Sequence, residues 1–206
     1  MLARDRFGLA RQLYATVFGD ASHRTRNAAE AEAMTFVETG DVTTGLMTLR
    51  ELEQQARALG DDTRLSATLN SIAVALVSAG RAEEALPLID EGLALSAKLN
   101  QATVWTRVIK SRALRLAGQT ERAIEVGEAV VTEYRETISP SGGPRRAEAE
   151  RELALALSQL KSRPHDRVRT LFESVVAQRR EFLGEDSPLT RQSLRELEAA
   201  QTKNPP

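Results

Sequence analysis

The sequence of 206 residues contains no cysteine and only two histidines. These absences exclude disulfides, thiolate metal ligands, cysteine nucleophiles and multi-histidine metal sites, and we expect no metal or other cofactor. The longest uninterrupted apolar run, Ile72 to Val77, is far shorter than the roughly 20 residues of a membrane-spanning helix. The 28 basic residues are balanced by 29 acidic residues, so the chain has no general attraction for nucleic acid or for a membrane surface. These features predict a soluble cytoplasmic protein.

Aromatic residues make up only 4% of the chain, whereas small and unbranched side chains dominate it. There are 30 alanines and 26 leucines, against 18 isoleucines and valines together. Alanine and leucine are among the best helix formers, and β-branched residues favour strands. The composition therefore predicts an all-α protein whose helices pack closely through small residues.

A helix-ending pattern recurs at a regular period along the chain. A large apolar residue is followed by glycine and an acidic residue at Phe18-Gly19-Asp20, Leu59-Gly60-Asp61 and Leu183-Gly184-Glu185. Asn100 and Gly142 fill the remaining positions, so the marks at residues 19, 60, 100, 142 and 184 are spaced by 41, 40, 42 and 42 residues. A second series falls between them, at Gly40, Gly80 and Gly118. Since each glycine separates two segments of helical periodicity, the spacing predicts repeated pairs of antiparallel helices.

We expect these pairs to form one repeat domain over residues 1–206. The domain would contain a half repeat, then four helix pairs, then a single capping helix with a polar outer face. The predicted ranges are 2–18 for the half repeat, 24–59, 63–99, 102–138 and 144–183 for the four pairs, and 187–201 for the capping helix. Close helix crossings, where no larger side chain fits, are expected at Ala73, Ala85, Ala123 and Ala156.

The second pair resembles a tetratricopeptide repeat (TPR). The resemblance rests on Gly80-Arg81-Ala82-Glu83-Glu84-Ala85-Leu86, preceded by Leu69, Ile72, Ala73 and Leu76. The run from Leu183 to Thr190 is similar to the longer form of the repeat found in kinesin light chains and in many bacterial signalling proteins. This resemblance implies a right-handed superhelical α-solenoid of antiparallel helix pairs. HEAT and armadillo arrays, with roughly 40 to 47 residues per unit, are the rival fold. The Gly-then-Ala spacing and the Leu-Gly-Asp/Glu loops argue against them.

In TPR arrays the first helix of each pair lines a concave groove that holds peptides. When the repeats of this chain are aligned with the family pattern, the resemblance assigns peptide binding to the residues at the groove positions. These are Met34, Val37, Asn70, Val74, Val77, Trp105, Val108, Arg112 and Arg115. Leu153 and Leu157 continue the same face in the fourth pair. Asn70 matches a groove asparagine that hydrogen-bonds the peptide backbone in the family.

Trp105 is the only tryptophan, and two arginines follow it on the same predicted helix. An aromatic side chain beside arginines has the composition of an interface hot spot, suited to an apolar side chain with a nearby carboxylate or phosphate. The alternative is that Trp105 and Val108 pack against the neighbouring repeat while Arg112 and Arg115 are solvated. This third pair fits the family pattern least well, because polar residues replace apolar or small ones at Arg107, Lys110 and Ser111.

The predicted function is a non-catalytic interaction module that binds a partner protein or peptide, as part of a bacterial signalling or regulatory scaffold. An enzyme is not expected, since neither His23 nor His165 stands in a motif with nucleophile or metal-ligand spacing. Nucleic-acid binding is a minor alternative. It rests on a local basic stripe formed by Arg107, Lys110, Arg112 and Arg115.

The chain opens on the second helix of a pair, with no first helix before it. This favours a fragment of a longer protein, and it also gives an alternative function. The apolar edge at the N-terminal end would be covered by another copy of the chain, so that the array associates with itself. A homo-oligomer is therefore a second expectation.

Overall fold

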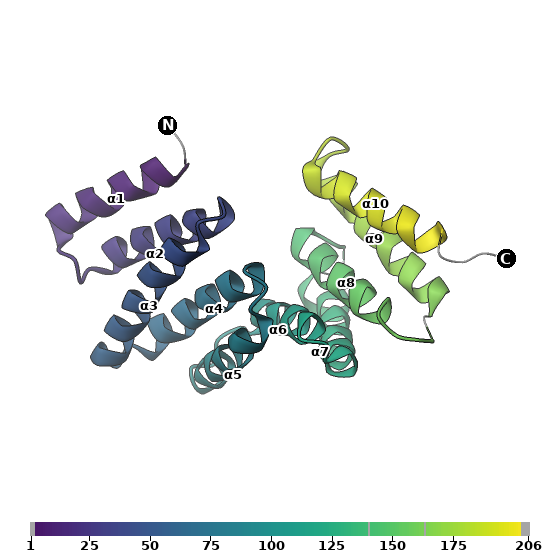
Figure 1. Ribbon diagram of the computed structural model, residues 1–206, viewed down its shortest axis with the longest axis horizontal. Coiled ribbons are helices and arrows are strands. Elements are labelled where there is room, and N and C mark those ends of the chain that lie inside the picture. Colours follow the sequence, from purple (N-terminus) through teal and green to yellow (C-terminus); the bar gives the residue numbers. More distant parts are fainter. Residues whose placement is uncertain (1–2, 140, 163, 203–206) are drawn as a thin grey trace. The chain divides into compact units, whose positions relative to one another are not determined.

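The computed structural model describes residues 3–139, 141–162 and 164–202, and every regular element in these ranges is a helix (Figure 1). In chain order they are α1 (Ala3–Phe18), α2 (His23–Glu38), α3 (Val42–Leu59), α4 (Asp62–Ser78), α5 (Ala82–Lys98), α6 (Val104–Leu116), α7 (Thr120–Glu133), the π-helix η1 (Tyr134–Ile138), α8 (Pro144–Leu157), α9 (His165–Leu183) and α10 (Pro188–Thr202). The predicted all-α repeat fold is confirmed. None of the helices in these ranges is long and apolar enough to cross a membrane.

The chain forms two compact units. The first unit extends to Thr103 and contains α1 to α5, and the second begins at Val104 and contains α6 to α10. Within each unit every helix packs against the next helix in the chain, so antiparallel pairs stack side by side. The pairs α2–α3, α4–α5, α6–α7 and α8–α9 correspond to the four predicted repeat ranges, with α2 and α4 each beginning one residue earlier than predicted. A single repeat domain remains a prediction, and residue 2 of the predicted half repeat lies outside the described residues.

Local signals in the sequence set the helix ends. Gly60 ends α3 in the left-handed conformation with a φ angle of 63°, and Asn100 adopts the same region, at 52°, where the series lacks glycine. At the start of α2 the side chain of Ser22 accepts a hydrogen bond of 3.1 Å from the backbone N–H of Thr25. Asp61 caps α4 in the same way. These caps explain why the helix boundaries follow from the sequence.

Small side chains are fully buried where helices pack against each other. Four alanines, at the crossings expected from the sequence, have an exposed fraction of 0%: Ala73, Ala85, Ala123 and Ala156. The second unit also has a large apolar cluster that includes Val108, Val130, Leu153, Leu157 and Phe172. The close helix spacing leaves no room for larger side chains at the alanine positions.

Candidate functional site

The first helix of each pair carries the residues predicted to bind a partner. In the first unit α2 contacts α4, and in the second unit α6 contacts α8. We name the surface shared by α2 and α4 the α2–α4 face. The surface shared by α6, α8 and α10 is the α6–α10 face. The two faces belong to different units, and each is described by itself.

Polar contacts join the two helices of the α2–α4 face. Ser71 Oγ on α4 donates a hydrogen bond of 2.6 Å to Glu30 Oε1 on α2. Arg64 Nη1 on α4 lies 3.5 Å from the other oxygen of the same carboxylate. Met34 follows Glu30 by one helical turn, and Val74 follows Ser71 by nearly one turn. Met34 and Val74 therefore each lie within about one helical turn of these contacts between α2 and α4.

The predicted residues of the α2–α4 face differ in burial. Val37 and Val77 are each 7% exposed, so they pack into the helix layer and offer little surface. Met34, Asn70 and Val74 are half-buried and remain partly at the surface. The Oδ1 atom of Asn70 is buried and has no hydrogen-bond partner among the described residues. An unpaired buried acceptor destabilises a fold by about 1–3 kcal/mol.

On the α6–α10 face Trp105 is half-buried and packs against the large apolar cluster of the second unit. The guanidinium carbon of Arg145 lies 5.6 Å from the centre of the indole ring, within cation–π range. Val108 is only 1% exposed, and Leu153 and Leu157 are 1% and 3% exposed. These three aliphatic residues belong to the core cluster, whereas Trp105 reaches the surface in part.

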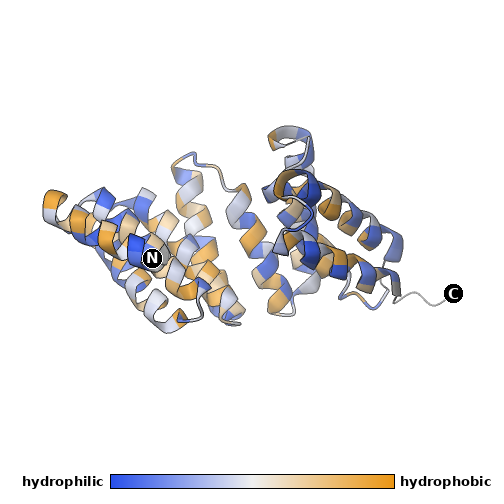
Figure 2. Cartoon of the chain, turned by 90° about the horizontal axis from the view of Figure 1, so that it is seen from above, coloured by the Kyte–Doolittle hydropathy of each residue, from blue (hydrophilic) through white to orange (hydrophobic). Residues whose placement is uncertain are grey.

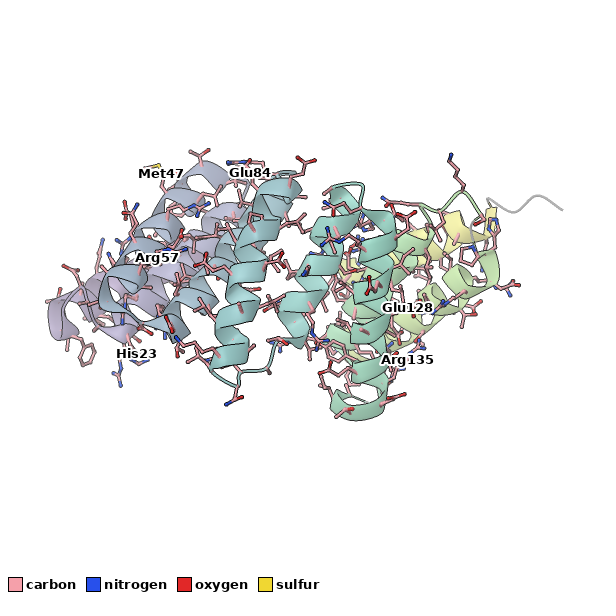
Figure 3. All side chains as sticks on the ribbon, turned by 90° about the horizontal axis from the view of Figure 1, so that it is seen from below. His23, Met47, Arg57, Glu84, Glu128 and Arg135 are labelled. Atoms are coloured by element: carbon pink, nitrogen blue, oxygen red, sulfur yellow. The ribbon has the colours of Figure 1, made fainter. Side chains whose placement is uncertain are left out.

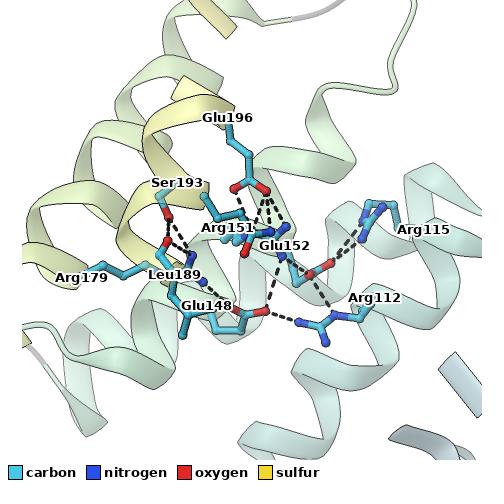
Figure 4. A network of polar contacts seen from close by, with 10 residues as sticks. Arg112, Arg115, Glu148, Arg151, Glu152, Arg179, Leu189, Ser193 and Glu196 are labelled. Atoms are coloured by element: carbon cyan, nitrogen blue, oxygen red, sulfur yellow. Dashed lines mark hydrogen bonds and ion pairs between the residues drawn. The ribbon is translucent and has the colours of Figure 1, made fainter. Parts of the chain in front are cut away.

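Arg112 and Arg115 on α6 are paired with carboxylates of the chain itself (Figure 4). Arg112 Nε donates a hydrogen bond of 2.9 Å to Glu152 Oε1 on α8, and Arg115 Nη2 donates one of 2.9 Å to Glu152 Oε2. Arg112 also donates to Glu148, one turn earlier on α8. The two arginines are therefore paired within the chain, although the Arg112 side chain is still 25% exposed, and Glu152 is only 1% exposed.

The same network continues to α9 and α10 (Figure 4). Arg151 on α8 donates hydrogen bonds of 2.5 and 2.9 Å to the two oxygens of Glu196 on α10. Arg179 on α9 donates one of 2.5 Å to Glu148 and one of 2.7 Å to Ser193 Oγ on α10. Burial lowers the pKa of Arg179, and its neighbour Glu148 opposes this change. Four helices are thus connected through paired charges.

The ion pairs of the arginine–glutamate network join four arginines to three glutamates. Its four arginines and three glutamates are Arg112, Arg115, Arg151, Arg179, Glu148, Glu152 and Glu196. Buried charges are costly unless each is paired, so removing one member leaves its partners uncompensated. The network therefore holds the helices of this face in one arrangement.

The sequence analysis did not identify the glutamates of the network. A signal was present, because Glu152 follows Arg112 by 40 residues, which is one repeat period. Glu30 and Ser71 on the other face are 41 residues apart. First helices of successive pairs lie side by side, so polar or oppositely charged residues one period apart indicate contacts between helices.

In the ranges that the structure describes, no group of three or more histidine, aspartate or glutamate side chains is placed to hold a metal ion. No protein-family model and no curated protein sequence matches the chain.

Solved structures of kinesin light chain-type proteins share the fold. A candidate kinesin light chain of Podosopora anserina with nearly identical TPR-like repeats has a TM-score of 0.65 at 24% identity, over 85% of each chain. A point variant of it has a TM-score of 0.64 at 22% identity, over 98% of this chain and 88% of that chain. BtubC (BKLC) from P. vanneervenii has a TM-score of 0.77 at 16% identity, over 97% of this chain and 82% of that chain.

The chain therefore has the TPR-like repeat fold seen in these kinesin light chain-type structures, as the resemblance in its sequence implied. Proteins of this architecture generally serve as protein–protein interaction or scaffold modules, because stacked helix pairs provide an extended binding surface.

Proposed function

We propose that the chain is a non-catalytic interaction module that binds a segment of a partner protein on the first-helix faces. The observation that supports this most directly is Asn70, a half-buried side chain whose Oδ1 atom is unpaired. A backbone N–H of the partner that reached this oxygen would satisfy an acceptor that the fold leaves without a hydrogen bond. Met34 and Val74, which are half-buried on the same face, would bury an apolar side chain of the partner.

The two faces favour different chemical groups of a partner. The α2–α4 face offers apolar surface and an amide, whereas the α6–α10 face offers the indole of Trp105 and the partly exposed guanidinium of Arg112. The Arg112 side chain keeps 25% exposure, two helical turns along α6 from Trp105. We therefore expect partner segments that combine an apolar side chain with a carboxylate.

Selection from a random-peptide display library, followed by calorimetric titration of the selected peptides, tests this function. Val74→Glu places a charge among apolar groups and is expected to weaken binding about tenfold or more, a loss of ~1.4 kcal/mol. Asn70→Ala removes the acceptor and is expected to weaken binding several-fold. Ala94→Glu is the matched control, because it adds the same charge at an exposed position of the second helix α5.

The control is expected to bind with unchanged affinity. Equal affinity of the wild type, Val74→Glu and Asn70→Ala would contradict the proposal. So would an equal loss in Val74→Glu and Ala94→Glu, which would indicate a general effect of the added charge.

Self-association is a second candidate function, favoured by large apolar side chains that α1 exposes. Either function is consistent with a cytoplasmic regulatory role, which the similarity to long repeats of bacterial signalling proteins supports. The case for nucleic-acid binding is weaker. Three of the four residues of the basic stripe, Arg107, Arg112 and Arg115, donate hydrogen bonds to glutamates of the chain.

A further inference from the structure

Arg26 is a buried arginine whose guanidinium has few partners within the chain. It lies in the first turn of α2, shortly after the helix begins at His23 (Figure 3). Its side chain is only 10% exposed. The Nε and Nη1 atoms are buried and have no hydrogen-bond partner among the described residues. Nη2 lies 3.6 Å from Asp61 Oδ2, which is too far for a hydrogen bond.

The burial of this guanidinium requires an explanation. An arginine keeps its positive charge in a folded protein, and all of its side-chain nitrogens are donors. Burying such a group is costly unless it is paired and hydrogen-bonded. Asp61 meets this requirement only in part, because its Oδ1 atom accepts a hydrogen bond from the backbone N–H of Arg64 and caps α4. Unpaired buried donors commonly mark a place where a water molecule or an ion binds.

The next helix pair is closed at the corresponding position. The buried residues of α2 and α4 match at an interval of 40 residues, so that Arg26 corresponds to Ser66, and Leu52 on α3 corresponds to Gly92 on α5. Ser66 Oγ lies 3.1 Å from the carbonyl oxygen of Gly92 and 2.7 Å from Ser96 Oγ, within hydrogen-bond distance of both. Small side chains thus complete each other's hydrogen bonds in the second pair, whereas the first pair has an arginine and a leucine.

The Arg26 side chain lines two adjoining cavities in the first unit, whose helices carry hydrophobic residues among hydrophilic ones (Figure 2). The first cavity has a volume of about 340 Å³, and its lining includes Arg11 on α1 and Leu52 on α3. The second has a volume of about 320 Å³ and an apolar part formed by Ala21, Ala58 and Leu59. Three residues line both cavities: Asp20, Arg26 and Gln55. We name the two cavities together the Arg26 site.

We propose that the Arg26 site binds a small aliphatic carboxylate. A carboxylate oxygen would accept hydrogen bonds from Nε or Nη1 of Arg26 and supply the negative charge that this guanidinium lacks. The apolar chain of the ligand would extend into the second cavity, against Ala58 and Leu59. The volumes suit a small molecule, since such sites enclose about 300–1,000 Å³. The Arg26 site is separate from the first-helix faces, so it does not depend on the function proposed above.

The charges around the site favour a singly charged ligand over phosphate. Asp20 lines both cavities, and Asp61 lies beside the guanidinium of Arg26. Arg11 is the other cation of the site, but its Nη1 atom lies 3.3 Å from a carboxylate oxygen of Glu32. A doubly charged phosphate would be repelled by the two aspartates, whereas a carboxylate brings one negative charge to one incompletely paired cation.

Titration of the isotope-labelled full chain with hexanoate, followed through amide chemical shifts, tests the proposal. Hexanoate is expected to bind with a dissociation constant on the order of 1 mM or less, with the largest shifts at Arg26, Gln55 and Ala58. Two matched ligands separate the parts of the recognition. Acetate lacks the apolar chain and hexanol lacks the charge, so each is expected to bind at least about tenfold more weakly. Phosphate is expected not to bind.

Two variants locate the ligand. Arg26→Gln removes the guanidinium and is expected to weaken hexanoate binding at least about tenfold. Arg81→Gln is the matched control, because it removes an arginine of the same unit whose side chain is 50% exposed, and it should bind hexanoate as the wild type does. Ala58→Glu places a carboxylate in the second cavity at an exposed position, where it should not disturb the fold. This variant is expected to bind several-fold more weakly, with Ala94→Glu as its control.

Urea unfolding of each variant verifies that it folds. Hexanoate that leaves every amide shift unchanged would overturn the proposal and make water the occupant of the cavities. Equal affinity for hexanoate and hexanol would overturn the role assigned to the guanidinium. Unchanged binding in both Arg26→Gln and Ala58→Glu would show that the ligand binds elsewhere. Phosphate that binds as tightly as hexanoate would overturn the assignment of a singly charged aliphatic ligand.

Discussion

Val37 on α2 and Gly45 on α3 are in such close contact that a Cβ atom added at Gly45 would lie 2.6 Å from Val37 Cγ2. The same atom would lie 2.7 Å from the carbonyl oxygen of Ala33. Glycine is required here by the close approach of two helices and not by its own φ angle. The contact also accounts for the burial of Val37, which the sequence analysis assigned to a binding surface.

Gly45→Ala is expected to destabilise the chain by about 1–3 kcal/mol, because α2 and α3 must separate to accept the methyl group. Urea denaturation measures the change. Gly92→Ala is the control, since the nearest atom to a Cβ there is 3.6 Å away. It should be neutral or stabilising by up to about 1 kcal/mol, through the better helix propensity of alanine. Equal stability of the two variants would contradict the close crossing.

Glu152→Ala is expected to destabilise the second unit by up to about 3–5 kcal/mol, because it leaves the charges of several partly buried arginines without their carboxylate. Glu128→Ala is the matched control at the surface, where its partner Arg167 has a side chain that is 54% exposed. That variant should lose only about 0.2–1 kcal/mol. Thermal or urea unfolding of both variants measures the difference. Similar small losses in the two would show that the network contributes little to the fold.

The repeat architecture could be predicted because its signals are local. A glycine or asparagine with a positive φ angle ends a helix wherever the sequence places it, as Gly60 and Asn100 do. Periodic leucines and alanines then define which side of each helix is buried. The end of the third pair is less regular, since α7 continues as a π-helix from Tyr134 to Ile138. No local pattern in the sequence distinguishes that turn from an α-helix.

The candidate site could be predicted only in part. The register of the repeat predicts on which side of a helix a residue lies, but it does not predict how deeply its side chain is buried. Val108 falls on the expected side of α6 and yet is 1% exposed, since the neighbouring helices close over it. Arg112 also lies on that side, but its guanidinium is paired with the carboxylate of Glu152, 40 residues later in the chain. The charge of an arginine alone does not identify the glutamate that pairs with it within the chain. The repeat period would have identified Glu152, because it lies one period after Arg112.

Arg57 on α3 donates hydrogen bonds of 2.6 and 2.9 Å to the two oxygens of Glu91 on α5. This hydrogen bonding lowers the pKa of the Glu91 carboxyl below its usual value. A carboxylate with a lowered pKa in the folded state stabilises the fold above its unfolded pKa of about 4.3. The contribution is lost as the pH falls through the folded pKa.

Glu91→Gln is therefore expected to cost about 0.2–1 kcal/mol near neutral pH, a small value because both side chains are partly exposed. The difference from the wild type should disappear as the solution is acidified below the folded pKa. Urea midpoints at neutral and acidic pH measure this change, with Glu125→Gln at an exposed position of α7 as the control. A difference that stays constant with pH would contradict the role of the carboxylate charge.

The central claim is that a partner segment binds the first helices, and amide chemical-shift mapping of a selected peptide on the isotope-labelled chain tests it most directly. The account predicts that the largest shifts fall on the α2–α4 face, at Met34, Val74 and both the backbone and side-chain amides of Asn70. Shifts that cluster instead on the second helices α3 and α5, with Asn70 unmoved, would contradict it.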